Sequence, residues 1–194
     1  MLLSLDLSSH NISLKRWNVM IGEIIKEIDL CLSRGCYIVA TMAALTLPDI
    51  CGRAKYPDME KQTKQRYIKW FDEYIGEYEK DPEDDLGMPY LSGELVYSLR
   101  CFMLHQGDVN IDNKKLDIEK FELLWEKKNK FDIYLNSSEA EISGVEGNKR
   151  AVHKTFSVNV QSLCMKLCRV ASRYYKANKE SFDFLKCGIV KSQY

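Results

Sequence analysis

Two residues on one segment of the chain have side chains suited to phosphodiester chemistry. Arg100 and His105 are five positions apart in the run Leu-Arg-Cys-Phe-Met-Leu-His-Gln-Gly over residues 99–107. Histidine transfers a proton near neutral pH, and arginine holds a phosphate bidentately and stabilises charge in a transition state. RNA supplies its own nucleophile, the 2′-hydroxyl, so this pair requires neither a metal nor a covalent residue. A simpler interpretation stays open, in which Arg100 forms a salt bridge and His105 caps a helix end.

The spacing alone does not bring these two side chains together. Ser92 is a typical N-cap, and Gly107 a typical stop, for a helix over 93–106. The residues expected on its buried face are Leu95, Val96, Leu99, Phe102 and Met103. At about 100° per residue, Arg100 and His105 lie about 140° apart on opposite edges of this face and roughly 7–8 Å apart along the axis. Convergence therefore requires a helix that ends before His105, or a second copy of the helix in a dimer.

A second candidate for function is a basic ridge near the end of the chain. Residues 149–179 contain eight Lys or Arg and no acidic residue. Within a helix expected over 159–179, four of these cations recur at spacings of three, four and three: Lys166, Arg169, Arg173 and Lys176. Tyr174 and Tyr175 lie near enough to offer stacking surface, so the ridge is a candidate RNA-binding surface that follows phosphates. The alternative is a solvated face that balances the acidic segment 72–85.

Composition limits the other classes of function. The chain has 194 residues, which suits a single domain, and 28 basic residues balance 28 acidic ones, so bulk charge does not hold it to nucleic acid. The longest uncharged stretch, residues 35–48, is shorter than a membrane span. The N-terminus lacks a basic region before its apolar run, so we expect a cytoplasmic protein with no membrane association. No phosphate loop, dinucleotide fingerprint or nucleophile elbow is present, and no cofactor is expected.

The cysteines indicate a reducing compartment rather than a metal site. There are seven, scattered along the chain, with no C-x-x-C pair. Cys164 and Cys168 are four apart on the expected last helix but lack a second pair of ligands at metal spacing, so no metal is predicted. Asp49, directly after Pro48, is expected either to cap a helix or to belong to a site.

The hydrophobic pattern predicts a mainly α fold: a helical bundle with a small appended β-hairpin. The helical core is expected over 17–127, the hairpin over 130–158 and a C-terminal helix over 159–179. The expected core helices are 17–34, a fully buried helix over 36–47 that ends near Pro48, 60–79, 93–106 and 115–127. Alternation over 131–136 and 152–158 predicts the two strands, joined by a turn region at 143–148.

The arginine–histidine segment also resembles a known family. Arg100-Cys-Phe-Met-Leu-His105, near the end of a late helix in a helical bundle, resembles the R-x4–6-H motif of HEPN domains, in the bacterial branch linked to toxins and phage defence. The phrases at residues 47–52 and 66–72 are similar to segments of bacterial proteins of this type. The resemblance implies a metal-independent endoribonuclease that acts on RNA as a homodimer with a composite site. Arg100 would stabilise the phosphate, His105 would act as general acid or base, and an antitoxin or another protein would be a partner.

One position favours an alternative function. Many active members of that family carry Asn or another polar residue directly after the arginine, where this chain has Cys101, a weak hydrogen-bonding group. The alternative is a non-catalytic helical dimerisation or interaction module, in which the helix over 93–106 forms a dimer face and the basic ridge contacts a partner or nucleic acid.

Overall fold

The computed structural model describes residues 20–79, 91–106, 120–125, 133–142 and 149–185, with side chains described except at 105–106, 120–121, 133–142 and 149–156. The expected leader over 1–16, the turn region 143–148 and the end of the acidic segment at 80–85 lie outside the described residues. Within them the fold is mainly α, as predicted, and a β-hairpin is attached to the helices.

The first helices form an antiparallel start to the bundle. Helix α2 spans Met20–Ser33, buries Ile21 and Ile28, and is followed by Gly35 at a φ of 76°, as expected for a glycine beyond a helix end. Helix α3 spans Tyr37–Ala44, and α4 spans Leu47–Lys55. The prediction of one buried helix ending near Pro48 is wrong. Pro48 instead stands in the first turn of α4, where its missing N–H costs no hydrogen bond.

The middle of the chain supplies most of the aromatic core. Helix α5 spans Thr63–Tyr74 and is followed by the short 3₁₀ turn η2, Gly76–Tyr78, so the helix expected over 60–79 is shorter than predicted. Helix α6 spans Gly93–Cys101, and a π turn, η3, continues it over Phe102–Gln106. The side chains of Tyr67, Trp70 and Phe71 from α5 are fully buried.

Three strands form one sheet in the order β1-β3-β2. Strand β2, Ile133–Ile142, pairs antiparallel with β3, Lys149–Asn159, in a register from Ile133 opposite Val158 to Ile142 opposite Lys149. This confirms the predicted hairpin. The predicted helix over 115–127 is wrong where the structure describes it, because Lys120–Leu124 is strand β1, parallel to β3 at Thr155–Asn159.

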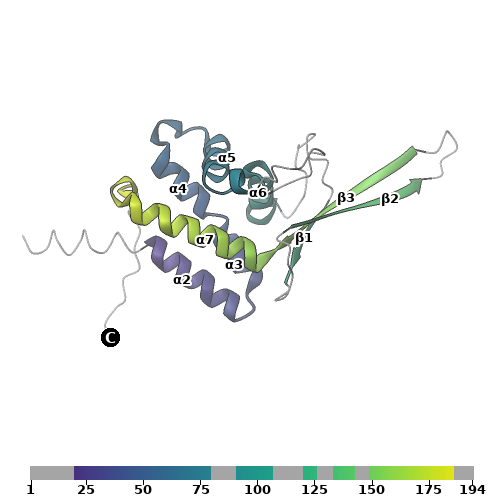
Figure 1. Cartoon of the computed structure of the whole chain (residues 1–194), viewed down its shortest axis with the longest axis horizontal. Helices are drawn as coiled ribbons and strands as arrows, with labels where there is room; N and C mark the ends of the chain where they lie inside the picture. The colour runs from purple at the N-terminus through teal and green to yellow at the C-terminus, as the bar shows by residue number, and fades with distance from the viewer. Residues whose placement is uncertain (1–19, 80–90, 107–119, 126–132, 143–148, 186–194) are drawn as a thin grey trace, which may run out of the picture.

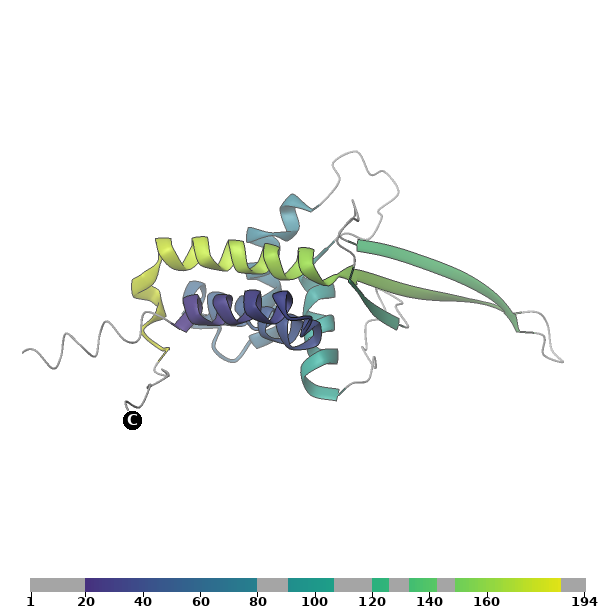
Figure 2. The ribbon, with the colours of Figure 1, turned by 90° about the horizontal axis from the view of Figure 1, so that it is seen from below.

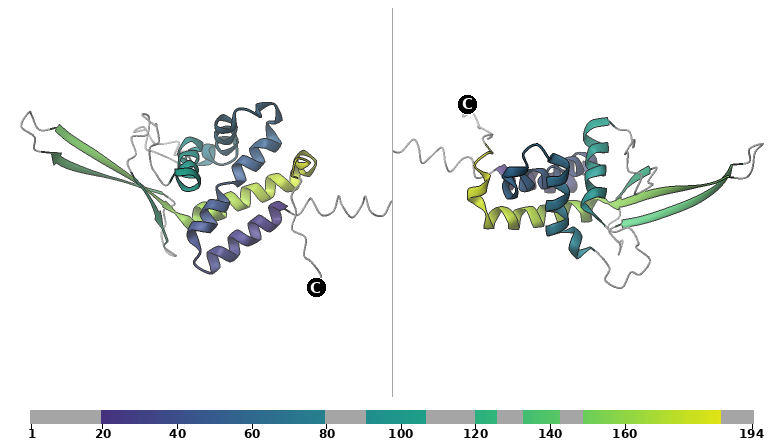
Figure 3. Two further views of the ribbon diagram at one scale, coloured as in Figure 1. Left: turned by 180° about the vertical axis from the view of Figure 1, so that it is seen from behind. Right: turned by 90° about the horizontal axis from the view of Figure 1, so that it is seen from above.

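The last helix closes the bundle. Helix α7, Val160–Ala177, follows β3 directly and is succeeded by the 3₁₀ turn η4, Lys179–Phe182. It runs antiparallel to α2 and also contacts α3 and α4. In Figure 1, α2 lies below α7, and α5 and α6 lie above it. The β2–β3 hairpin projects away from the helices in every view (Figures 2 and 3). Among the described residues, no helix combines the length and apolarity needed to cross a bilayer.

Candidate functional sites

Helix α6 places Arg100 at the edge of its buried face. The side chain of Ser92 accepts a hydrogen bond from the Leu95 N–H at 3.3 Å, which confirms the predicted N-cap. Leu95, Val96 and Leu99 are buried as expected. The apolar face of α6 therefore packs within its own chain, and Arg100 follows it at the boundary with solvent.

The guanidinium of Arg100 is paired with Asp49 of α4. Its Nη2 lies 2.9 Å and its Nε 3.1 Å from the same oxygen, Asp49 Oδ2, and the side chains are 16% and 19% exposed. Burial by itself would lower the pKa of Arg100, but the negative charge of Asp49 raises it, and the net pKa is above the usual value for arginine. The simpler interpretation of Arg100, that it forms a salt bridge, is therefore confirmed, and Asp49 is the partner.

The backbone changes its winding between Arg100 and His105. The α-helix ends at Cys101, and residues Phe102–Gln106 form a π turn with wider i→i+5 hydrogen bonding. Each residue in such a turn rotates through a smaller angle than in an α-helix. The angle of about 140° expected between Arg100 and His105 in one straight α-helix therefore does not apply. Around the axis of this segment, the two residues are closer together than that. The side chain of His105 lies outside the described residues.

Three arginines from three helices line the same hollow as the Asp49 carboxylate. A hollow of about 370 Å³ is lined by residues of α2, α4, α5, α6 and the segment after η4: Met20, Asp49, Ile50, Arg53, Thr63, Arg66, Arg100, Phe184 and Leu185. Arg53 is one helical turn after Asp49, so both lie on one face of α4. Helix α5 approaches closely at Gly52, where a Cβ would lie 3.2 Å from the carbonyl oxygen of Arg66. We name this set the arginine pocket.

Arg53 and Arg66 were not predicted from the sequence as members of this site. Arg66 carried a signal, because it lies four residues before Trp70 and next to Tyr67, on the face of α5 that is otherwise buried. A cation on an apolar helix face indicates either an ion pair or a ligand. Arg53 carried no comparable signal, since its role depends on how α4 and α5 pack.

The basic ridge lies along α7 as predicted. Asn159 caps the helix, with its Oδ1 accepting from the Ser162 N–H at 3.0 Å. The apolar face of α7 is buried at Val160, Leu163, Leu167, Ala171 and Tyr174. Arg169, Arg173 and Lys176 are exposed, whereas Lys166 is 22% exposed and pairs with Glu79 at 2.5 Å. That one ion pair agrees with the expectation that the ridge balances part of the acidic segment.

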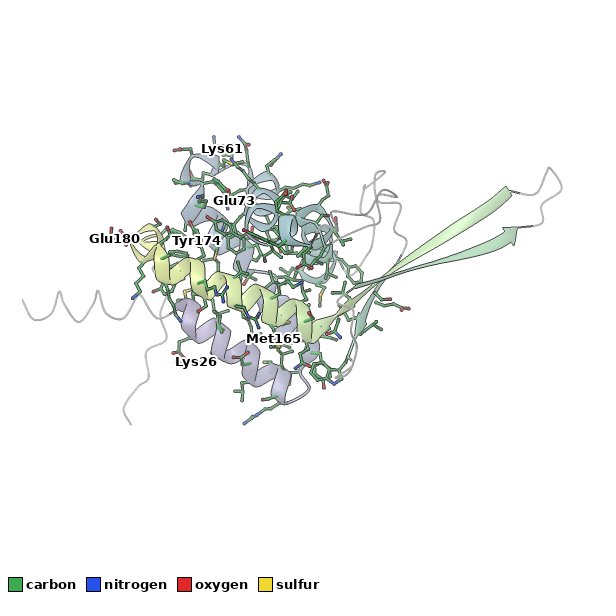
Figure 4. All side chains as sticks on the ribbon, viewed as in Figure 1. Lys26, Lys61, Glu73, Met165, Tyr174 and Glu180 are labelled. Atoms are coloured by element: carbon green, nitrogen blue, oxygen red, sulfur yellow. The ribbon has the colours of Figure 1, made fainter. Side chains whose placement is uncertain are left out.

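A groove of about 610 Å³ lies between η2 and α7. Its lining combines the C-terminal end of α5 and the residues around η2 with one face of α7: Tyr74, Ile75, Tyr78, Glu79, Ser162, Met165, Lys166, Arg169, Val170 and Arg173. Tyr78 is 81% exposed and Met165 is 46% exposed. Figure 4 shows Met165 and Tyr174 toward opposite ends of α7. Lys176, although part of the ridge, is not among the lining residues. We name this feature the α7 groove.

The stacking surface differs from the predicted one. Tyr174 is only 6% exposed, and its ring packs edge-on against Trp70 and Tyr74 at centroid distances of 5.8 Å and 5.1 Å. Tyr175 is half-buried against Phe182 at 5.0 Å. Tyr174 is a core residue, so the expectation that it offers stacking surface is wrong, whereas Tyr175 is only partly buried. The exposed ring beside the ridge is that of Tyr78.

The arginine pocket and the α7 groove are separate, and the described residues of neither form a metal-binding cluster. The arginine pocket and the α7 groove share no lining residue. Over the described part of the chain, no group of three or more His, Cys, Asp or Glu side chains is arranged to hold a metal ion. Burial raises the pKa of both Cys164 and Cys168 to about 12, which keeps these thiols protonated.

Comparison of the chain with protein-family models, with curated proteins and with solved structures finds no match. The function is therefore inferred from this chain's own residues.

Proposed function

We propose that this protein binds single-stranded RNA in the α7 groove. The observation that carries the proposal is the exposed ring of Tyr78 in the same groove as Arg169 and Arg173. Proteins that bind single strands combine a basic groove, which follows the phosphates, with aromatic rings on which bases stack at about 1–3 kcal/mol per base. The α7 groove contains both kinds of group.

The charge of the groove also favours a polyanion. Among the described residues, Lys166, Arg169 and Arg173 line it against one carboxylate, that of Glu79, which is already paired with Lys166. The two arginines are exposed, so a phosphate reaches them without displacing a buried partner. Arginine binds phosphate through a planar fork and also stacks on bases, which suits a strand whose bases are unpaired.

Titration of a short fluorescent single-stranded RNA, followed by anisotropy across a range of salt concentrations, tests this proposal. The double variant Arg169→Ala/Arg173→Ala should bind more weakly and reduce the slope of log K against log salt by about 1.4, at roughly 0.7 per lost phosphate contact. Tyr78→Ala should weaken binding by about 1–3 kcal/mol with the slope unchanged. Lys176→Ala, on the same helix outside the groove, is the matched control. Equal affinity of all four proteins contradicts the proposal.

A second candidate is RNA cleavage of the HEPN type, with Arg100 stabilising the phosphate and His105 acting as general acid or base. The π turn favours it, because the α-helix ends before His105, one of the two conditions for convergence. Purified protein is incubated with structured RNA in the presence of a chelator and compared with Arg100→Ala and His105→Ala. Cleavage lost in both variants supports the candidate. Equal cleavage by all three, or cleavage by none, removes it.

The remaining candidate is a non-catalytic interaction module. It is favoured by apolar side chains exposed on α2 and α3, where Leu30, Ile38 and Val39 are 50%, 63% and 57% exposed. RNA binding that survives Arg100→Ala and His105→Ala, without cleavage, supports this candidate.

For each of these candidate functions we propose a homodimer in the cytoplasm, acting in a bacterial defence or stress system with an antitoxin or another protein as partner. Sedimentation velocity tests the homodimer.

A further inference from the structure

Arg66 in the arginine pocket is a buried cation that the described protein does not neutralise. The residue is 7% exposed and packs on Gly52, with which its backbone is in close contact. Its Nη1 donates a long hydrogen bond of 3.4 Å to the Met59 carbonyl oxygen, and its buried Nε has no hydrogen-bond partner among the described residues. No carboxylate among them forms a salt bridge with it. A buried charge is costly unless an opposite charge or several hydrogen bonds compensate it.

Within the arginine pocket, the described neighbours of Arg66 add positive charge. Arg53 and Arg100 line the same hollow, and Asp49, which pairs with Arg100, is the only carboxylate among the described lining residues. Three cations against one anion give these described residues a formal charge of +2. Arg53 is exposed, and its guanidinium rests on the Phe184 ring, 4.5 Å from the centroid, at the rim of the hollow. A dianion in the hollow matches this excess.

Neutral hydrogen-bond donors border the same space. Thr63, the first residue of the 12-residue helix α5, lines the hollow, and the side chain of Gln62 does not cap that helix. The N–H groups and the positive dipole end of a helix attract anions. An adjoining hollow shares Arg53, Arg66 and Phe184, and adds the hydroxyl of Ser181 and the exposed carboxylate of Glu60. At about 370 Å³, the arginine pocket accommodates a phosphate with a sugar-sized group attached.

We propose that the arginine pocket binds a phosphomonoester, with Arg66 donating from the inner wall and Arg53 from the rim. Arginine forks match the geometry of phosphate oxygens, and two negative charges balance the excess in the pocket. The phosphate is carried either by a small molecule such as a nucleoside monophosphate or by the 5′ end of an RNA. The site is independent of the α7 groove, with which it shares no residue, and its test uses no residue of the Arg100–His105 pair.

Isothermal titration with inorganic phosphate, adenosine monophosphate and adenosine tests the pocket on the full chain. Phosphate and the monophosphate should bind the unaltered protein, and adenosine should not. A parallel arm compares short RNAs that differ only in a 5′-phosphate or a 5′-hydroxyl. Adenosine monophosphate that binds at least as tightly as the 5′-phosphorylated RNA assigns the small-molecule source. A 5′-phosphorylated RNA that binds more tightly than both adenosine monophosphate and the 5′-hydroxyl RNA assigns the RNA end. Failure of every phosphorylated probe to bind more tightly than its unphosphorylated counterpart overturns the proposal.

Two substitutions separate the pocket from general anion effects. Arg66→Met keeps the length of the side chain and removes the charge, so it should raise the dissociation constant at least about tenfold while the melting temperature without ligand stays the same or rises. Arg53→Gln, at an exposed position with little risk to folding, should also weaken binding severalfold. Arg34→Gln, at an exposed arginine that lines neither the arginine pocket nor the α7 groove, is the matched control. Affinity unchanged in Arg53→Gln, or lowered equally by Arg34→Gln, overturns the assignment even if Arg66→Met fails to fold.

Discussion

Helix α6 is held against α5 at Gly93, and adding one methyl group there should measurably destabilise the protein. A Cβ at this position would lie 2.6 Å from the carbonyl oxygen of Ile68, 2.9 Å from its Cα and 3.0 Å from Asp72 Oδ1. Two of these atoms are backbone, so they cannot rotate away. The Gly93 N–H also donates to Asp72 Oδ1 at 2.6 Å, and that hydrogen bond fixes where α6 begins.

The size of the effect follows from these contacts. Forcing an extra methyl into a packed contact costs about 1–3 kcal/mol, and weakening a hydrogen bond to a carboxylate adds about 1.5–3 kcal/mol. Replacing a helical glycine by alanine returns about 0.5–1 kcal/mol. We expect Gly93→Ala to lower the free energy of unfolding by about 3 kcal/mol, which for a chain of this size lowers the melting temperature by roughly 6–12 °C.

Thermal and urea unfolding followed by circular dichroism measure this change. Gly22→Ala in α2 is the matched control, because a Cβ at Gly22 meets nothing within 4 Å. The control should be stabilised by about 0.5–1 kcal/mol, so the two glycine-to-alanine changes have opposite signs. A Gly93→Ala protein that melts at or above the unaltered protein would refute the tight contact between α5 and α6, and with it the placement of Arg100 beside Asp49.

Further substitutions test other parts of the structure. Tyr67→Phe removes the buried hydrogen bond from its hydroxyl to the Leu45 carbonyl oxygen at 3.1 Å, and it should cost about 1–3 kcal/mol in urea unfolding, whereas Tyr78→Phe at an exposed position should cost nothing measurable. Asn159→Ala removes the N-cap of α7 and should lower the free energy of unfolding by about 1 kcal/mol in the same urea titration. Asn178→Ala, which removes a side-chain hydrogen bond to the Tyr174 carbonyl oxygen at the other end of the helix, is the comparison. A hydrogen bond from Tyr56 lowers the pKa of Glu73 below its usual range, so Glu73 contributes stability that is present above the ordinary glutamate pKa and is lost as pH falls through its lower folded value. Tyr56→Phe should therefore destabilise the protein more at pH 7 than at pH 3, and an equal loss at both values would show that the hydrogen bond is not the cause.

The parts of the fold that were predictable from sequence are those whose signal is local. Helix α7 has a strong apolar stripe, a capping asparagine and a cationic face, and its bounds agree with the prediction to within two residues. The hairpin was visible because β2 and β3 are close in sequence. Strand β1 was not, since its partner, Thr155–Asn159, is about 35 residues away, and Lys120–Leu124 has apolar residues at spacings that suit either a helix or a strand.

The candidate sites divide in the same way. The cations of the ridge followed from spacing along one helix, but the aromatic partner did not, because whether Tyr78 or Tyr174 is exposed depends on how α5 and α7 pack. Arg100 was identified from its own segment, whereas Asp49, Arg53 and Arg66 join it through contacts between α4, α5 and α6. Such contacts leave no periodic signal in a single sequence.

The position of α7 has a consequence for synthesis of the protein on the ribosome. The helix packs on α2, α3 and α4, yet it is translated after all of them and after the whole hairpin. At typical rates of about 5–20 residues per second, the apolar faces of α2–α4 wait on the order of ten seconds for the helix that covers them. Completion of the bundle by α7 is therefore placed late in translation, after the hairpin has been synthesised.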